Sequence, residues 1–114
     1  VLYGGISAES EVSLASGKQC VAALREAGYT VAPIEVGADL GALIAALREA
    51  RPDAVFNTLH GRYGEDGCIQ GVLDWLGLPY THSGLRASAL AMDKAAAKAA
   101  FAAAGLPVAP SRIV

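Results

Sequence analysis

Residues 54–67 read Ala54-Val55-Phe56-Asn57-Thr58-Leu59 and then His60-Gly61-Arg62-Tyr63-Gly64-Glu65-Asp66-Gly67. The first part is mostly apolar, as expected for a central parallel strand whose two faces are both covered. The second part is a polar, glycine-rich loop. In an open parallel sheet, ligands bind beyond the carboxyl ends of the strands, where such loops begin. This segment therefore predicts a buried strand that leads into a binding loop.

Strand and helix signals alternate on both sides of this segment. Three further strands are predicted, over residues 1–3, 30–36 and 78–81. Pro33 lacks a backbone donor, which places the 30–36 strand at a sheet edge. Apolar spacing and end signals predict helices over residues 12–27, 39–47, 69–76, 83–92 and 93–105. This order, with short connections, favours an α/β fold with an open parallel sheet and right-handed crossovers.

The ends of the predicted helices carry their own signals. Asp39 and Asp93 precede helices and are expected to cap them. Gly28 follows a helix and is expected to take the left-handed conformation that ends it. N-caps are also expected from three serines: Ser7, Ser10 and Ser13.

Length and composition exclude several classes of protein. The 114 residues suit one compact domain, and a content of 54% hydrophobic and 18% charged residues excludes intrinsic disorder. The formal net charge of −2 excludes the basic surface of a nucleic-acid-binding protein. No apolar run approaches the ~20 residues of a membrane-spanning helix. Because the chain begins with Val1 and its sole methionine is Met92, we expect it to be an excerpt of a longer protein.

The predicted strand order of the sheet, 2-1-3, places two polar loops opposite each other. One loop is residues 4–11, after the first strand, and the other is residues 60–67. A site is expected between them. The first loop does not have the Gly-x-Gly-x-x-Gly pattern of a dinucleotide site, because residue 6 is Ile and residues 7–11 contain no glycine.

Glu9 and His60 are the leading candidates within these loops. The carboxylate of Glu9 suits a cationic group such as an ammonium; alternatively, it is only a favourable charge near a helix N-terminus, worth ~0.3–1 kcal/mol. The His60 ring is expected at the carboxyl edge of the sheet, where it either bonds a ligand or is satisfied by its own loop. Arg62 is expected to pair with Glu65 or Asp66, or with an anionic substrate.

The remaining polar candidates give weaker signals. Lys94 lies in a first helical turn, where a cation is unfavourable unless an anion is near; it is either a phosphate contact or a solvated lysine. No metal site is expected, since adjacent acidic residues such as Glu65-Asp66 commonly stabilise a turn. The two cysteines, Cys20 and Cys68, are expected to be packed thiols in a reducing cytosol.

Taken together, these motifs resemble the N-terminal domain of the D-alanine–D-alanine ligases, ATP-grasp enzymes of peptidoglycan precursor synthesis. The resemblance extends in order along the whole chain. It is carried by Gly4-Gly5-x-Ser7-Ala8-Glu9-x-Glu11-Val12-Ser13-Leu14, Leu59-His60-Gly61-Arg62-x-Gly64-Glu65-Asp66-Gly67, Gln70-Gly71, Leu76-Gly77-Leu78-Pro79-Tyr80-Thr81, Ser83-Gly84, Ser88-Ala89-Leu90-Ala91-Met92-Asp93-Lys94 and Gly105-Leu106-Pro107.

The resemblance implies a fold and a reaction. Residues 1–114 would form a single substrate-binding domain with an open, mostly parallel Rossmann-like sheet and helices on both faces, the pre-ATP-grasp domain. The whole enzyme would join two D-alanines through a D-alanyl phosphate, with ATP and Mg²⁺ (or Mn²⁺), as a homodimer in the bacterial cytoplasm, without nucleic-acid or membrane partners. The ATP-grasp domains are absent from this chain, so the chain alone is expected to be inactive.

The resemblance also assigns roles to four residues. Glu9 would hold the ammonium of the first D-alanine, and His60 would line the same pocket; these two are the expected catalytic residues. Val12 would be an apolar contact near the first D-alanine. Lys94 would reach the phosphates of the nucleotide. The metal ligands of the family are expected outside this chain.

Two other functions stay open from the sequence. One is a related ligase that makes D-alanyl-D-lactate or another D-alanyl product. The other is a non-catalytic α/β module that binds an amino acid. A dinucleotide-binding oxidoreductase is disfavoured, because the glycine pattern is missing and Glu9 would repel a phosphate.

Overall fold

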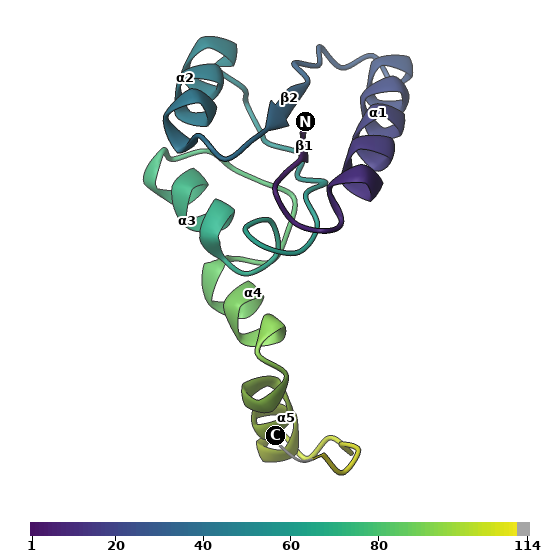
Figure 1. The fold of residues 1–114 in the computed structure, drawn as a ribbon, viewed down its shortest axis with the longest axis vertical. Helices are drawn as coiled ribbons and strands as arrows, with labels where there is room; N and C mark the ends of the chain where they lie inside the picture. Colours follow the sequence, from purple (N-terminus) through teal and green to yellow (C-terminus); the bar gives the residue numbers. More distant parts are fainter. Residues whose placement is uncertain (112–114) are drawn as a thin grey trace.

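The computed structural model describes residues 1–111 as an α/β fold with a small parallel sheet and five helices (Figure 1). Residues 112–114, which end the predicted domain 1–114, lie outside the described residues. In chain order the elements are β1 Leu2–Gly4, α1 Ser10–Glu26, β2 Ile34–Val36, α2 Leu40–Ala50, α3 Cys68–Trp75, α4 Leu85–Met92 and α5 Lys94–Ala103.

The sheet is built on β1. Strand β2 pairs with it in parallel, with Leu2 opposite Ile34. On the other side of β1, the Leu2 N–H donates to the Phe56 carbonyl at 2.9 Å and the Leu2 carbonyl accepts from the Thr58 N–H at 2.9 Å. Residues 79–81 follow beside this segment, because the Val55 N–H donates to the Pro79 carbonyl at 2.8 Å. The parallel order of segments predicted around β1 is confirmed.

The predicted strands over 54–59 and 78–81 are wrong as continuous strands. Among residues 1–111 these segments form only isolated parallel bridges, Leu2 with Asn57 and Val55 with Tyr80. Side chains replace backbone partners at this point. The Asn57 N–H donates to Thr81 Oγ1 at 3.2 Å, and the Leu59 N–H donates to Asn57 Oδ1 at 3.0 Å. The ladder therefore stops where the polar loop begins.

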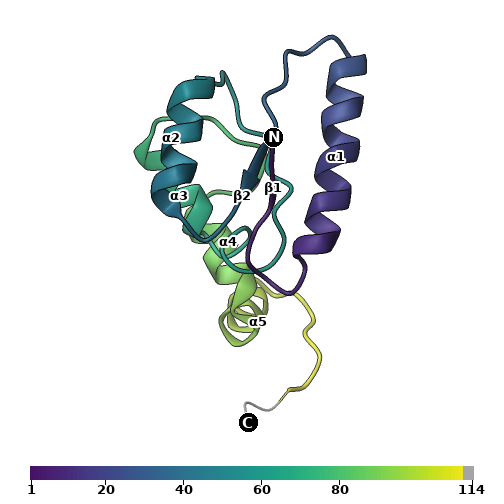
Figure 2. The same cartoon turned by 45° about the horizontal axis from the view of Figure 1, so that its top comes forward.

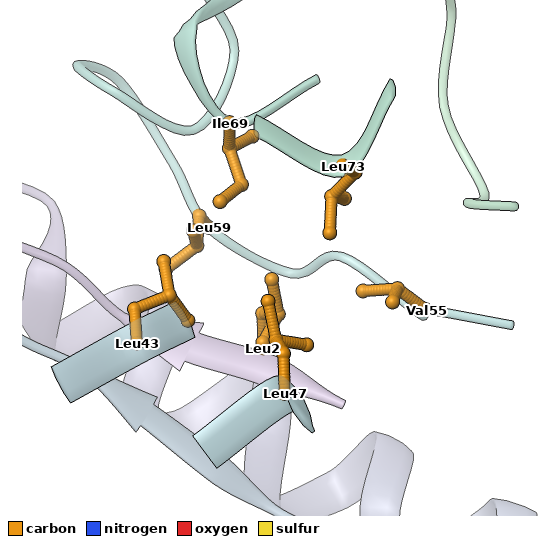
Figure 3. Close-up of a cluster of buried hydrophobic side chains, with 7 residues drawn as sticks. All are labelled: Leu2, Leu43, Leu47, Val55, Leu59, Ile69 and Leu73. Atoms are coloured by element: carbon orange, nitrogen blue, oxygen red, sulfur yellow. The ribbon is translucent and has the colours of Figure 1, made fainter. Parts of the chain in front are cut away.

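The main hydrophobic core lies between the strands and the pair α2 and α3, while α1 lies on the other side of the strands (Figure 2). Apolar side chains from β1, α2, the 55–59 segment and α3 meet in this core (Figure 3). Its buried members are Leu2, Leu43, Leu47, Val55, Leu59, Ile69 and Leu73. Each such side chain contributes ~1.5–3 kcal/mol when it is removed from water.

Helix α1 approaches β1 closely because it carries glycine and serine on its buried face. A Cβ atom at Gly17 would lie 2.2 Å from Cβ of Tyr3. The buried Ser13 hydroxyl accepts from the Gly4 N–H at 2.9 Å and donates to the Thr58 carbonyl at 2.7 Å. Small side chains therefore set the distance between α1 and the sheet.

The helix caps predicted at two aspartates and one glycine are confirmed. Asp39 accepts from the Ala42 N–H, Asp93 caps α5, and Gly28 has φ +91°. The serines expected to cap α1 do not do so. The N-cap of α1 is Glu9, which makes no side-chain cap bond, because the Ser7 and Ser13 hydroxyls bond to other segments instead.

The last two helices extend away from the sheet. Helix α5 packs against α4 and lies beyond it, far from the strands (Figure 1). The described helices include none that is long and apolar enough to span a bilayer. On α3, the side chain of Trp75 is 91% exposed.

Because α1 lies so close to β1, an added methyl group at Gly17 is predicted to destabilise the fold. Replacing a helical glycine with alanine normally stabilises a helix by ~1 kcal/mol. In Gly17→Ala the added methyl overlaps Tyr3, so we expect a net loss of ~1–3 kcal/mol in the free energy of unfolding. Urea denaturation followed by circular dichroism measures it. Gly37→Ala is the control, because a Cβ at Gly37 meets open space; equal stability of the two variants would contradict the predicted clash.

Candidate functional site

Two loops at the carboxyl end of the sheet are joined directly. The Ser7 hydroxyl, in the loop after β1, donates to the His60 carbonyl at 2.8 Å and accepts from the Glu9 N–H at 3.1 Å. Gly61 has φ +65°, and a Cβ there would lie 3.0 Å from Oε2 of Glu9. The prediction that these loops face each other is confirmed.

The carboxylate of Glu9 is exposed at the N-terminus of α1. Within residues 1–111 it forms no salt bridge, since the single such pair there joins His60 to Glu65. The helix dipole favours a negative charge at this end. A carboxylate held there without a cation of its own is able to receive one from a ligand.

His60 is half-buried beside its own loop. Its Nδ1 lies 4.0 Å from Oε1 of Glu65, while Oε2 of Glu65 accepts from the Gly61 N–H at 2.6 Å. Glu65 therefore stabilises the turn, as the sequence predicts. Nowhere in the described part of the chain are three or more His, Cys, Asp or Glu side chains grouped to hold a metal ion.

The loop that carries His60 is held from below by two buried amides for which no structural role was predicted. Nδ2 of Asn57 and Nε2 of Gln70 both donate to the Gly64 carbonyl at 3.1 Å. Nδ2 of Asn57 also lies 3.3 Å from Nδ1 of His82. The available signal was an asparagine inside an apolar strand and a glutamine on the buried face of a helix, both of which require hydrogen-bond partners.

The other sequence-predicted residues have different outcomes. Val12 is 57% exposed in the first turns of α1, near Glu9. Lys94 begins α5, so the structure does not bring it to the two loops (Figure 1). Arg62 does not pair with Glu65 or Asp66: its guanidinium lies over the Tyr63 ring, 4.8 Å from the centroid.

The expectation that both cysteines are packed is wrong for one of them. Cys20 is partly buried, whereas Cys68 is exposed at the first residue of α3, where the loop turns into the helix. Partial desolvation and the neighbouring Asp66 carboxylate nevertheless raise the pKa of the Cys68 thiol.

Sequence relatives cover the whole of this chain. The D-alanine–D-alanine ligase of Granulibacter bethesdensis is 75% identical over 114 residues, and that of Acidiphilium cryptum is also 75% identical over 114 residues. The family profile described as "D-ala D-ala ligase N-terminus" matches residues 42–83. The chain is homologous to the N-terminal part of D-alanine–D-alanine ligases. It spans 37% and 38% of the lengths of these two curated relatives.

Solved ligase structures share the fold. The D-alanine–D-alanine ligase of Bacillus anthracis, crystallised with ATP, superposes with a TM-score of 0.80 at 36% identity, covering 91% of this chain and 35% of that one. The ligase of Coxiella burnetii gives a TM-score of 0.80 at 28% identity, covering 96% of this chain and 41% of that one. Most of this chain therefore shares its fold with part of each of these two ligases.

Because the buried amide of Asn57 supports the His60 loop, replacing this amide with a carboxylate is predicted to destabilise the fold. Asn57→Asp keeps the shape and the Oδ1 acceptor but removes the donor to Gly64, and places a carboxylate beside that carbonyl. We expect a loss of ~1–3 kcal/mol in the free energy of unfolding, measured by urea denaturation. Gln19→Glu makes the same chemical change on an exposed part of α1 and is the control. An Asn57→Asp variant as stable as this control would contradict the assigned role.

The raised pKa of Cys68 predicts slow alkylation. The thiolate is the nucleophile, so a raised pKa lowers the reactive fraction at pH 8. Asp66→Asn removes the negative charge while keeping an oxygen that accepts from the Cys68 N–H. We expect faster iodoacetamide labelling of Cys68 at pH 8, measured by peptide mass spectrometry, and no change with Asp53→Asn. An unchanged rate in Asp66→Asn would show that the carboxylate does not influence this thiol.

Proposed function

We propose that residues 1–114 form the N-terminal, substrate-binding domain of an ATP-dependent D-alanine–D-alanine ligase. The observation that carries the proposal is the 75% identity to two such ligases over the entire chain. The finer fold that we propose is a Rossmann-like, pre-ATP-grasp domain with an open, mostly parallel sheet. The order β2, β1, 55–58, 79–81, with helices on both sides, supports it.

In the proposed reaction, the carboxylate of the first D-alanine takes the γ-phosphoryl group of ATP and becomes an acyl phosphate. The amine of a second D-alanine then attacks this carbonyl and releases phosphate. Glu9 binds the ammonium of the first D-alanine, His60 lines the same pocket, and Val12 supplies an apolar contact. Two observations support these roles: the exposed carboxylate of Glu9 has no cationic partner within residues 1–111, and it lies against the His60 loop.

Lys94 is the one residue of this chain that we assign to the nucleotide. It is an exposed cation at the first residue of α5, which suits a contact to phosphate oxygens. When bound, Mg²⁺, or Mn²⁺ in its place, neutralises charge on the transferred phosphoryl group. Residues 1–111 offer no grouped metal ligands, so we assign metal binding to the remainder of the enzyme.

We further propose that the enzyme is a homodimer in the bacterial cytoplasm, where it makes the dipeptide used in peptidoglycan synthesis. Its partners are then D-alanine and ATP, without nucleic acid or membrane. The ligases of Granulibacter and Acidiphilium, which share three quarters of the residues of this chain, support the dipeptide product and the bacterial origin, whereas the dimer and the cytoplasmic location rest on the family resemblance.

The function is tested by phosphate release from the full-length protein that contains this chain, with ATP and Mg²⁺. D-Alanine, L-alanine and D-lactate are offered in turn, and D-lactate also together with D-alanine. We expect release that requires D-alanine and yields one dipeptide per phosphate, and no turnover by residues 1–114 alone. Release only with D-alanine and D-lactate together would indicate a depsipeptide ligase, and no release at all would overturn the proposal.

The role of Glu9 is tested in the same assay. Glu9→Gln keeps the shape and removes the charge that faces the ammonium. A charge-assisted hydrogen bond contributes ~1.5–3 kcal/mol, so we expect kcat/KM for the first D-alanine to fall at least tenfold. Glu11→Gln removes a neighbouring carboxylate from the first turn of the same helix and is the matched control. Equal effects of the two variants would show that Glu9 acts only as a favourable charge at the N-terminus of α1 and does not bind the ammonium.

A further inference from the structure

One hydroxyl group connects the two loops that carry Glu9 and His60. Oγ of Ser7 donates to the His60 carbonyl at 2.8 Å and accepts from the Glu9 N–H at 3.1 Å. The hydroxyl therefore bonds two backbone groups that are far apart in the sequence. Within residues 1–111, no other hydrogen bond joins residues 5–9 to residues 60–67.

The remaining hydrogen bonds of the first loop hold its two ends but do not reach the second loop; at its far end, the Glu9 carbonyl accepts from the Ser13 N–H at 3.0 Å. The Gly5 N–H donates to the Val36 carbonyl, which fixes the start of the loop on β2. The Ser10 N–H donates to the Ser7 carbonyl, a bond within the loop itself. Between these points the loop meets Gly61, where a Cβ would lie 3.1 Å from Cβ of Ser7 and 3.0 Å from Oε2 of Glu9.

The second loop is rigid enough to serve as an anchor. Its turn is closed by bonds from the Gly64 and Glu65 N–H groups to the Gly61 carbonyl at 2.9 Å. The buried Asn57 and Gln70 amides hold it from below. A bond from Ser7 to the carbonyl of His60 therefore ties the Glu9 loop to a loop that is itself supported from below.

We propose that Ser7 is a positioning residue for Glu9: its hydroxyl anchors the Glu9 loop to the His60 carbonyl and so places the Glu9 carboxylate for an ammonium ligand. This inference rests on the proposed function. In this proposal Ser7 acts through its bonds to the His60 carbonyl and the Glu9 N–H and needs no contact of its own with the substrate. Removing the hydroxyl leaves the Glu9 N–H without its acceptor and frees the loop from its anchor, and small misplacements of a binding group are costly in catalysis.

The test uses the full-length protein with Ser7→Ala. We expect kcat/KM for the first D-alanine to fall about tenfold, as for the loss of ~1.4 kcal/mol. KM for ATP should stay within twofold of the unchanged protein. Ser16→Ala is the matched control, since the Ser16 hydroxyl donates only to the Val12 carbonyl on the exposed face of α1; it should leave both constants unchanged.

A double-mutant cycle separates positioning from a general loss of structure. If Ser7 acts through Glu9, Ser7→Ala should lower kcat/KM by less than twofold in the Glu9→Gln background. A full tenfold loss in that background would overturn the proposal. So would unchanged kinetics of Ser7→Ala in an active enzyme.

Amide hydrogen exchange tests whether Ser7 anchors the Glu9 loop, and it does not depend on enzyme activity. Peptides covering residues 5–12 should exchange faster in Ser7→Ala than in the unchanged protein, while those covering α2 should not. This readout stands even if the unchanged protein makes no dipeptide, an outcome that would overturn the proposed function. Equal exchange in both proteins would overturn the anchoring role of Ser7.

Discussion

The buried hydroxyl of Ser13 holds together the segments from which the site is built. It lies in α1, accepts from the N–H of Gly4 at the end of β1, and donates to the carbonyl of Thr58 in the neighbouring segment. One side chain thus fixes a helix and two extended segments relative to each other. Both site loops begin within a few residues of these bonds, so their mutual position is inherited from this junction.

Above this junction the site is assembled from backbone groups and short polar side chains. Ser7 joins the loops at the top, and Asn57 and Gln70 support the second loop from beneath. Glycine is favoured at Gly61 by its φ of +65° and required at Gly64, where a Cβ would lie 2.3 Å from Cβ of Leu59. The side chains of Glu9 and His60 take no part in these bonds. The residues that hold the two loops in place are therefore different from the residues to which we propose ligand-binding roles.

The sequence was sufficient for features that depend on local patterns or on topology. Apolar spacing located the helices, Asp39 and Asp93 signalled their own caps, and the strand order brought Glu9 toward His60. It was insufficient where a hydroxyl or amide chooses a distant partner. From the sequence, Ser13 is predicted to be an N-cap, because it lies near the start of a helix. The residues around it give no sign that its hydroxyl bonds to the carbonyl of Thr58, 45 residues away. For Lys94, its place in a first helical turn left both a phosphate contact and a solvated lysine open; the resemblance favoured the nucleotide, and α5 places the residue away from the two loops.

The exposure of Trp75 has an optical consequence. It is the sole tryptophan of the chain, and its indole is 91% exposed on α3 in the folded state. An indole already surrounded by water changes its surroundings little when the chain unfolds. The wavelength of its fluorescence emission would therefore change little when this domain unfolds. The same property makes it a sensitive reporter of anything that docks on α3, because covering it would shift its emission to shorter wavelengths.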